Sequence, residues 1–280
     1  MMDYKVWLAA YGHTFFSLSV GFGIMVTYAS YLKPKTNLTG SGLIVGFANA
    51  STEILAGIGI FAALGFMAYT ANSNVQDVVS GGIGLAFIAF PKIISSMGSG
   101  SDLFGFLFFT SLFVAGISSM VSILEVPIAA MMDKLKWGRR KAVTIVGGGS
   151  AVVSIALFSS VNSIKLVDII DHFINNIGII GGALLSIVCI AWFKRSALLE
   201  IKNHVNAIST VKLGKGWDFT LTVITSLILL VTLAMTVYHL LMKGYGDYSA
   251  SLQWIFGWGC VMFCAVVAVI LAQMKDREER

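Results

Sequence analysis

The stretch YGHTFFSLSVGFGIMVTYASY, from Tyr11 to Tyr31, decides how this chain is built. It contains no lysine, arginine, aspartate or glutamate, and it is long enough for a membrane helix, which needs about 20 apolar residues. Its centre, from Ser17 to Gly23, nevertheless holds two serines and two glycines. One interpretation is close packing of helices through small residues. The other is a helix that unwinds and frees backbone groups to bind a ligand. Spacing alone favours close packing.

The composition of the whole chain places this stretch in a membrane protein. Apolar residues make up 57% of the 280 residues and charged residues only 12%, and the mean hydropathy is +0.85. A soluble domain usually has about 25% charged residues. The net charge of +5 is explained by lysines and arginines that gather on the cytoplasmic side of a membrane protein. We therefore expect a lipid bilayer around the chain and no nucleic-acid partner.

Seven apolar segments are long enough to cross a membrane, which predicts an all-α, polytopic transmembrane helical bundle. They lie at residues 5–32, 40–69, 102–132, 140–160, 170–193, 217–242 and 249–273. Residues 1–280 are thus predicted to form a single transmembrane domain. The connector at 70–101 is too polar and too broken to span. Its amphipathic stretch, 75–90, is followed by Pro91, which we expect to end one helix and begin another turn. This connector is predicted to be a helical hairpin on the extracellular face.

Basic residues predict the orientation of these segments. The loops at 33–37, 133–141 and 194–216 and the tail after residue 274 fall on one side, and they hold most of the 19 lysines and arginines. The positive-inside rule places that side in the cytoplasm. We therefore predict a multi-pass plasma-membrane protein with its N-terminus outside and its C-terminus in the cytoplasm. A chain that exports its own start without a signal sequence suggests that helices are missing upstream.

Polar groups inside the predicted spans are the next candidates for function. Asn49 and Glu53 are four residues apart, so they share one helical face, and His13 is the closest candidate partner for this glutamate. A hydrogen-bonded structural glutamate and a packed histidine remain open as alternatives. For Glu125 we expect a side chain that snorkels or caps. No nucleotide-binding loop, zinc-ligand spacing or nucleophile–base pair occurs, which predicts that the protein is not an enzyme and has no organic cofactor.

The stretch from Tyr11 to Tyr31 closely resembles helix six of the neurotransmitter:sodium symporter family, in its bacterial amino-acid branch. SGLIVGFANASTE at 41–53 resembles helix seven, FVAGISS at 113–119 resembles helix eight, and residues 168–178 resemble the start of helix ten. The resemblance covers essentially the whole chain, as helices six to twelve. It implies the second five-helix repeat plus two terminal helices of the inverted-repeat symporter fold. The family's helices one to five are absent from this sequence, and a separate chain is one way to supply them.

The resemblance implies a substrate site, two sodium sites and two gates. The positions that match the substrate site are Phe16, Ser19, Phe22, Ser119 and Ile123. The positions that match the sodium sites are Ser17 and Asn49 in one, and Ala115, Ser118 and Ser119 in the other. All of them offer hard oxygen donors, which suit an alkali cation. The outer gate matches Asp171, and the inner gate matches Tyr31 and Asp133. Packing and helix-capping roles remain open for the serines and for Asp171 respectively.

Two positions distinguish this chain within the resemblance. Glu53 stands where chloride-dependent members have a serine, which implies a chloride-independent transporter whose carboxylate supplies negative charge and takes up a proton in the empty return step. His13 stands where the family usually has glutamine. We hypothesise that His13 bonds to Glu53 and alters the pH dependence of transport.

The leading hypothesis is sodium-coupled symport of neutral, hydrophobic amino acids by alternating access, with Na⁺ as the co-transported ion and this chain as a partial transporter. The alternative from another class is a non-transporting seven-helix membrane protein, such as a receptor or an accessory subunit. A retinal-type receptor is disfavoured because residues 249–274 contain no lysine for a Schiff base.

Overall fold

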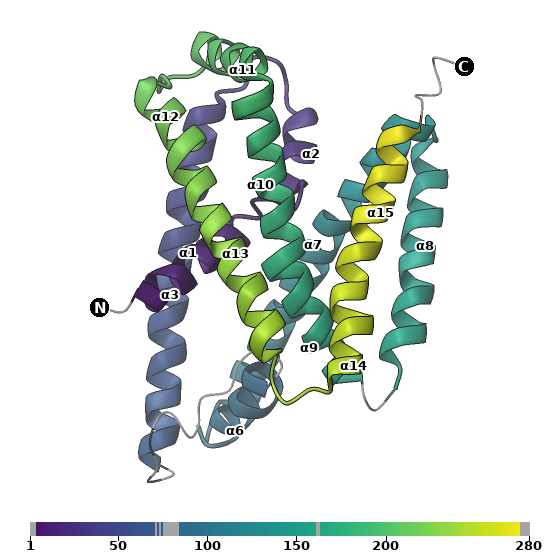
Figure 1. Ribbon diagram of the computed structural model, residues 1–280. Coiled ribbons are helices and arrows are strands. Elements are labelled where there is room, and N and C mark those ends of the chain that lie inside the picture. Colours follow the sequence, from purple (N-terminus) through teal and green to yellow (C-terminus); the bar gives the residue numbers. More distant parts are fainter. Residues whose placement is uncertain (1–3, 71, 73, 75–83, 161–162, 275–280) are drawn as a thin grey trace. The chain divides into compact units, whose positions relative to one another are not determined.

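The computed structural model describes residues 4–70, 72, 74, 84–160 and 163–274, and every regular element among them is a helix (Figure 1). Six of the helical runs are long and apolar enough to cross a membrane. They are Leu38–Thr70, Ser101–Leu135, Arg139–Phe158, Ser163–Phe193, Lys215–Lys243 and Ala250–Gln273. These runs confirm the all-helical class and match six of the predicted segments.

The first predicted segment, 5–32, is a broken helix. Helix α1 (Tyr4–Ser17) and helix α2 (Ile24–Ser30) are separated by the non-helical residues 18–23. Within this break, Gly21 and Gly23 have φ values of 86° and 78°, and Ser19 has a φ of 54°. Glycine adopts this left-handed backbone at little cost, whereas a residue with a Cβ rarely does. The structure therefore supports the unwound helix over simple close packing.

Residues 42–121 form the smaller of two compact units. This smaller unit contains most of α3 (Leu38–Thr70), η1 (Leu85–Ala89), α6 (Phe90–Ser95) and the first part of α7 (Ser101–Leu135). The ring of Phe90 stacks on Phe108 with centroids 4.6 Å apart, and Phe87 stacks on Phe109 at 6.2 Å. These aromatic pairs hold the short connector helices against α7.

The expected helix break at Pro91 is not found, because helix continues from Leu85 to Ser95. A π-helical turn, η1, comes directly before the proline, and the N–H of Phe90 bonds the carbonyl of Leu85. The turn has thus already left the usual α-helical pairing where proline, which has no N–H, enters the helix. Most of the predicted amphipathic stretch, 75–83, lies outside the described residues.

Residues 1–41 and 122–280, in their described parts, form the larger unit. Its runs Ser163–Phe193, Lys215–Lys243 and Ala250–Gln273 combine α-helix with single π-helical turns, which locally widen a helix, whereas α8 is α-helical throughout. Its further elements are α8 (Arg139–Phe158), α9 (Ser163–Phe173), η2 (Ile174–Ile179), α10 (Ile180–Val188), η3 (Cys189–Phe193), α11 (Arg195–Ile208), α12 (Lys215–Phe219), η4 (Thr220–Thr225), α13 (Ser226–Lys243), α14 (Ala250–Leu252), η5 (Gln253–Trp258) and α15 (Gly259–Gln273).

The buried core of the larger unit centres on Phe173 and Ile169, which are both 0% exposed, with Ile177 and Leu240 beside them. A Cβ at Gly257 in η5 would lie 2.7 Å from the ring of Phe173. Only glycine therefore allows η5 to approach α9 this closely.

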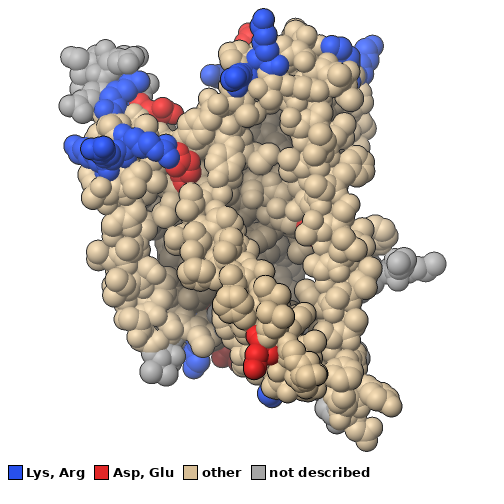
Figure 2. Space-filling view, turned by 180° about the vertical axis from the view of Figure 1, so that it is seen from behind, with Lys and Arg blue, Asp and Glu red and all other residues tan. Residues whose placement is uncertain are grey.

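Three of the basic loops meet at one end of the larger unit. Asn37 donates to the hydroxyl of Thr210 at 2.5 Å, and Thr39 donates to the carbonyl of Val211 at 2.9 Å, which joins the loops after α2 and α11. Arg139, in the third basic loop, belongs to a network that includes Tyr31 at the end of α2. The surface between the charged ends of the helices carries few Lys, Arg, Asp or Glu side chains (Figure 2). The basic tail beyond residue 274 lies outside the described residues.

Candidate functional site

The break at 18–23 is held in the larger unit by close contacts to its glycines. A Cβ at Gly21 would lie 3.0 Å from Ala183 of α10, and a Cβ at Gly23 would lie 3.1 Å from Val126 of α7. Both glycines also have positive φ. Positive φ and close approach therefore each disfavour a larger residue at these two positions.

Two predicted substrate residues come together beside the break. The rings of Phe16 and Phe22 meet edge to face with centroids 5.3 Å apart. Phe16 lies in the last turn of α1 with half of its surface exposed, and Phe22 lies in the non-helical segment. Ser19, also within the break, has its N–H bonded to the carbonyl of Phe16 at 2.9 Å. An aromatic pair therefore lies at the start of the break, and the backbone of Ser19 is bonded to one of its two residues.

The predicted site residues divide between the two units. The larger unit holds His13, Phe16, Ser17, Ser19, Phe22, Tyr31, Ile123, Asp133 and Asp171. The smaller unit holds Asn49, Glu53, Ala115, Ser118 and Ser119.

Within the smaller unit, two pairs of predicted residues are in contact. Asn49 donates to the carboxylate of Glu53 at 2.8 Å, which confirms that they share one face of α3. Ser118 donates its hydroxyl proton to the carbonyl of Ala115 at 2.9 Å. The resemblance assigns the oxygens of both residues to one sodium site. Two of the oxygens predicted for that sodium site are thus close together on α7.

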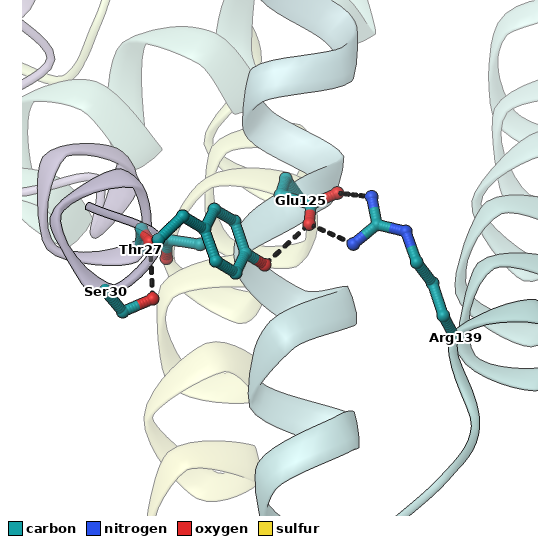
Figure 3. A network of polar contacts seen from close by, with 5 residues as sticks. Thr27, Ser30, Glu125 and Arg139 are labelled. Carbon is teal, nitrogen blue, oxygen red and sulfur yellow. Dashed lines mark hydrogen bonds and ion pairs between the residues drawn. The ribbon is translucent and has the colours of Figure 1, made fainter. Parts of the chain in front are cut away.

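At the end of α2, a polar network joins three helical elements (Figure 3). Tyr31 donates to Glu125 at 2.7 Å, and both terminal nitrogens of Arg139 donate to the same carboxylate at 2.8 and 3.0 Å. Glu125 lies in α7 and is only 7% exposed, whereas Arg139 is the first residue of α8. Such a bidentate ion pair satisfies the hydrogen-bonding needs of a buried carboxylate and is among the stronger polar contacts in proteins. We call these three residues the Glu125 network.

The expectation that Glu125 snorkels or caps is wrong, because the side chain is buried and ion-paired. Asp133, the other residue predicted for the inner gate, is exposed and takes no part in the Glu125 network. The sequence did hold one signal for this network, since a carboxylate within an apolar span usually requires a partner. Its partners, Tyr31 and Arg139, come from other elements and could not be chosen from spacing.

A second carboxylate cluster lies where α9 meets the loop before α14. Tyr245 and Tyr248 donate to the two oxygens of Asp168 at 3.1 and 2.8 Å. Gln253, which is 8% exposed, bonds the backbone N–H of Tyr245 at 2.8 Å and the carbonyl of Tyr248 at 2.8 Å. Burial, together with the bond to Asp168, raises the pKa of Tyr245 to about 12. We call Asp168, Tyr245, Tyr248 and Gln253 the Asp168 cluster.

Asp171, the predicted outer-gate residue, lies one helical turn after Asp168 and accepts a bond from Asn175 at 2.8 Å. Sequence reasoning treated Asp168 as a helix-terminus residue and missed the two tyrosines. Both come from a loop about eighty residues away, at separations of 77 and 80.

Comparison with known proteins adds the family. Residues 1–277 match the sodium:neurotransmitter symporter family. The chain is 38% identical over 275 residues to an "uncharacterized sodium-dependent transporter" of Methanocaldococcus jannaschii, covering 98% of this chain and 55% of that protein. It is 28% identical over 284 residues to the human "sodium- and chloride-dependent neutral and basic amino acid transporter B(0+)", covering 98% and 44%.

The chain thus spans about half the length of these relatives. The family consists of multi-pass membrane transporters, which confirms the prediction that the protein is not an enzyme. The match over nearly all of its residues identifies this chain as a member of the sodium:neurotransmitter symporter family.

Proposed function

We propose that this chain is the C-terminal part of a sodium-coupled symporter for neutral, hydrophobic amino acids that works by alternating access. The break at 18–23 carries the proposal. Irregular backbone at membrane depth is tolerated only where it is buried in protein or lines a cavity. Symporters with inverted repeats use such breaks, near the middle of the membrane, to bind substrate and coupling ion.

The chemistry of the break suits a neutral substrate with an apolar side chain. Phe16 and Phe22 offer an aromatic pair, and no charged residue occurs from Tyr11 to Tyr31. Aromatic walls with few polar groups are typical of sites that select an apolar ligand. We assign Ser19, Ile123 and Ser119 to the same site on the basis of the family resemblance.

Sodium is the proposed coupling ion because the assigned ligands offer oxygen donors only. They are Ser17 and Asn49 for one ion, and Ala115, Ser118 and Ser119 for the other. Hydroxyl, amide and carbonyl oxygens suit an alkali cation better than sulfur or imidazole does. The described residues contain no group of three or more His, Cys, Asp or Glu side chains that could hold a metal ion.

We propose that transport does not require chloride. The basis is Glu53, whose carboxylate accepts a hydrogen bond from Asn49 within α3. A carboxylate beside a sodium ligand supplies the negative charge for which other members would use an anion. We further propose that His13 alters the pH dependence of the return step. The pH profile of uptake in a His13→Gln variant tests this, and an unchanged profile rejects the role of His13.

A complementary set of helices completes the proposed transporter. No residue in the most apolar part of α7 is buried within the described structure, although Ser118 and Ser119 lie exposed there. Polar side chains in membrane helices face other protein or a cavity rather than lipid. Because the chain spans about half of its relatives, we propose that segments equivalent to helices one to five cover these residues. The basic loops then face the cytoplasm of a plasma membrane, as the positive-inside rule requires.

The test is uptake in proteoliposomes. The 280-residue chain is reconstituted alone and together with the part of the M. jannaschii relative that it does not match. Radiolabelled leucine, phenylalanine and lysine are supplied under an inward sodium or potassium gradient. The proposal predicts sodium-driven uptake of leucine or phenylalanine, and not of lysine, when both parts are present. Absence of uptake in both preparations favours the alternative of a receptor or accessory subunit.

A further inference from the structure

Two hydrogen bonds join α2 to the second half of α7 at matching positions. The hydroxyls of Tyr28 and Ser122 lie 2.6 Å apart, and Tyr31 donates to Glu125 at 2.7 Å. The tyrosines are three residues apart on α2, and their partners are three residues apart on α7. Residues at this spacing lie on one face of a helix, so the two bonds form successive rungs between the helices. We call the contact between Tyr28 and Ser122 the first rung.

We propose that Tyr28 and Ser122 are positioning residues that hold α2 against α7 and thereby fix the backbone of the break. This inference rests on the proposed function, because the break is the proposed substrate and sodium site. Helix α2 has only 7 residues, and the break separates it from α1. A helix this short has little stability of its own, so its place depends on side-chain contacts.

Of the two contacts, the first rung is the one whose residue on α2 lies nearer the break along the chain. Tyr28 follows the N-cap of α2, Gly23, by five residues, which is about 7.5 Å along a helix. Ser122 directly precedes Ile123, a proposed substrate residue. Gly23 itself lies close to Val126, one turn further along α7. Tyr28 and Ser122 therefore tie the second half of α2 to the part of α7 that belongs to the proposed site.

The two rungs differ in chemistry. Tyr31 bonds a carboxylate that is also paired with Arg139, so removing Arg139 or Glu125 leaves its partner's charge unbalanced. The first rung joins two neutral hydroxyls and can be removed without stranding a charge. Loss of one neutral hydrogen bond typically changes an equilibrium by about 2- to 10-fold. That change is small enough to leave the chain folded and large enough to measure.

The positioning role is tested first on the 280-residue chain in lipid nanodiscs by hydrogen–deuterium exchange. Ser122→Ala and Tyr28→Phe are each expected to speed the exchange of α2 amides by about 2- to 10-fold, with no change in α1. Ser122→Thr, which keeps the hydroxyl, is expected to restore slow exchange. Ser30→Ala is the matched control, because Ser30 donates to the carbonyl of Thr27 within α2 itself. Unchanged α2 exchange in both rung variants overturns the proposal.

The functional consequence is tested in the two-part proteoliposomes. Ser122→Ala and Tyr28→Phe are each expected to raise the KM for sodium by about 2- to 10-fold while the maximal rate is kept. The double variant is expected to match either single variant, because both changes break the same bond. Additive effects, or a wild-type KM in both variants, overturn the proposal. If the wild type shows no uptake but the exchange result holds, the proposed function fails while the positioning of α2 stands.

Discussion

The Glu125 network and the Asp168 cluster both pair a carboxylate with tyrosine hydroxyls, yet they differ in what surrounds them. Tyr31 and the side chain of Arg139 are 55% and 59% exposed around the Glu125 carboxylate. The Asp168 cluster sits beside Ile169 and Phe173, which are both 0% exposed. The Glu125 network is thus a buried carboxylate with exposed partners, and the Asp168 cluster is part of a packed core.

This difference indicates two mechanical roles. The Glu125 network joins α2, α7 and α8 through partner side chains that are more than half exposed, so these bonds can break without opening a packed core. The Asp168 cluster ties the loop before α14 to α9, and Gln253 fixes that loop further through its backbone. We therefore interpret the first as a contact that opens and the second as a permanent brace.

The largest effect is expected from Arg139→Ala, because it leaves the Glu125 carboxylate buried without its cation. This variant is expected to have the lowest melting temperature of those proposed here, measured in detergent. The double variant Glu125→Gln/Arg139→Ala is expected to recover part of the loss, since a neutral amide tolerates the same site. A double variant less stable than Arg139→Ala contradicts the network as described.

The second largest effect is expected in the buried core beside the Asp168 cluster, where Gly257 lies close to Phe173. Gly257→Ala places a methyl group 2.7 Å from the ring of Phe173 and is expected to cost about 1–3 kcal/mol of unfolding free energy. Gly182→Ala is the matched control, because no other side chain or distant backbone lies within 4 Å of a Cβ at that helical position. Denaturant unfolding of the two variants measures the difference. Equal stability of both variants rejects the close approach of η5 to α9.

A smaller effect separates the two roles directly. Tyr248→Phe removes one bond to Asp168 and is expected to cost about 1 kcal/mol of stability without changing the KM for substrate. Tyr31→Phe is expected to change the KM for substrate and to leave the stability nearly unchanged. Thermal unfolding and uptake kinetics of the same two preparations provide the comparison. A shifted KM in Tyr248→Phe removes the distinction between brace and opening contact.

The smallest effect is on the titration of Tyr245, followed by ultraviolet absorbance of the phenolate. Its pKa of about 12 is due first to burial and then to Asp168, so Asp168→Asn is expected to lower this pKa only partly. The folded-state pKa is raised above the ordinary value near 10. The contribution of protonated Tyr245 to the stability of the folded protein is therefore complete below about pH 10. It is lost as the pH rises toward about 12. A Tyr245 that titrates near pH 10 in the wild type rules out its buried bond.

Sequence reasoning reached the helical class and six of the seven predicted spans because apolar length alone specifies a membrane helix. It did not reach π-helical turns such as η2 and η5, since these are defined by backbone bonds between residues five apart, which residue type does not specify. The unwound segment at 18–23 was found through family resemblance, whereas glycine and serine spacing favoured packing. The partners of Glu125 and Asp168 were missed because they lie on distant elements, and the pattern within a single helix contains no information about them.

The most direct test of the account is binding of radiolabelled leucine by the two-part preparation, measured with Gly21→Ala beside the wild type. Gly21 combines a φ of 86° with a close approach to α10, so a methyl group there must reshape the break. The account predicts saturable binding that needs sodium, disappears when potassium replaces it, and is lost in Gly21→Ala. Binding that is insensitive to sodium, or that survives unchanged in Gly21→Ala, contradicts the claim that the break is half of the site.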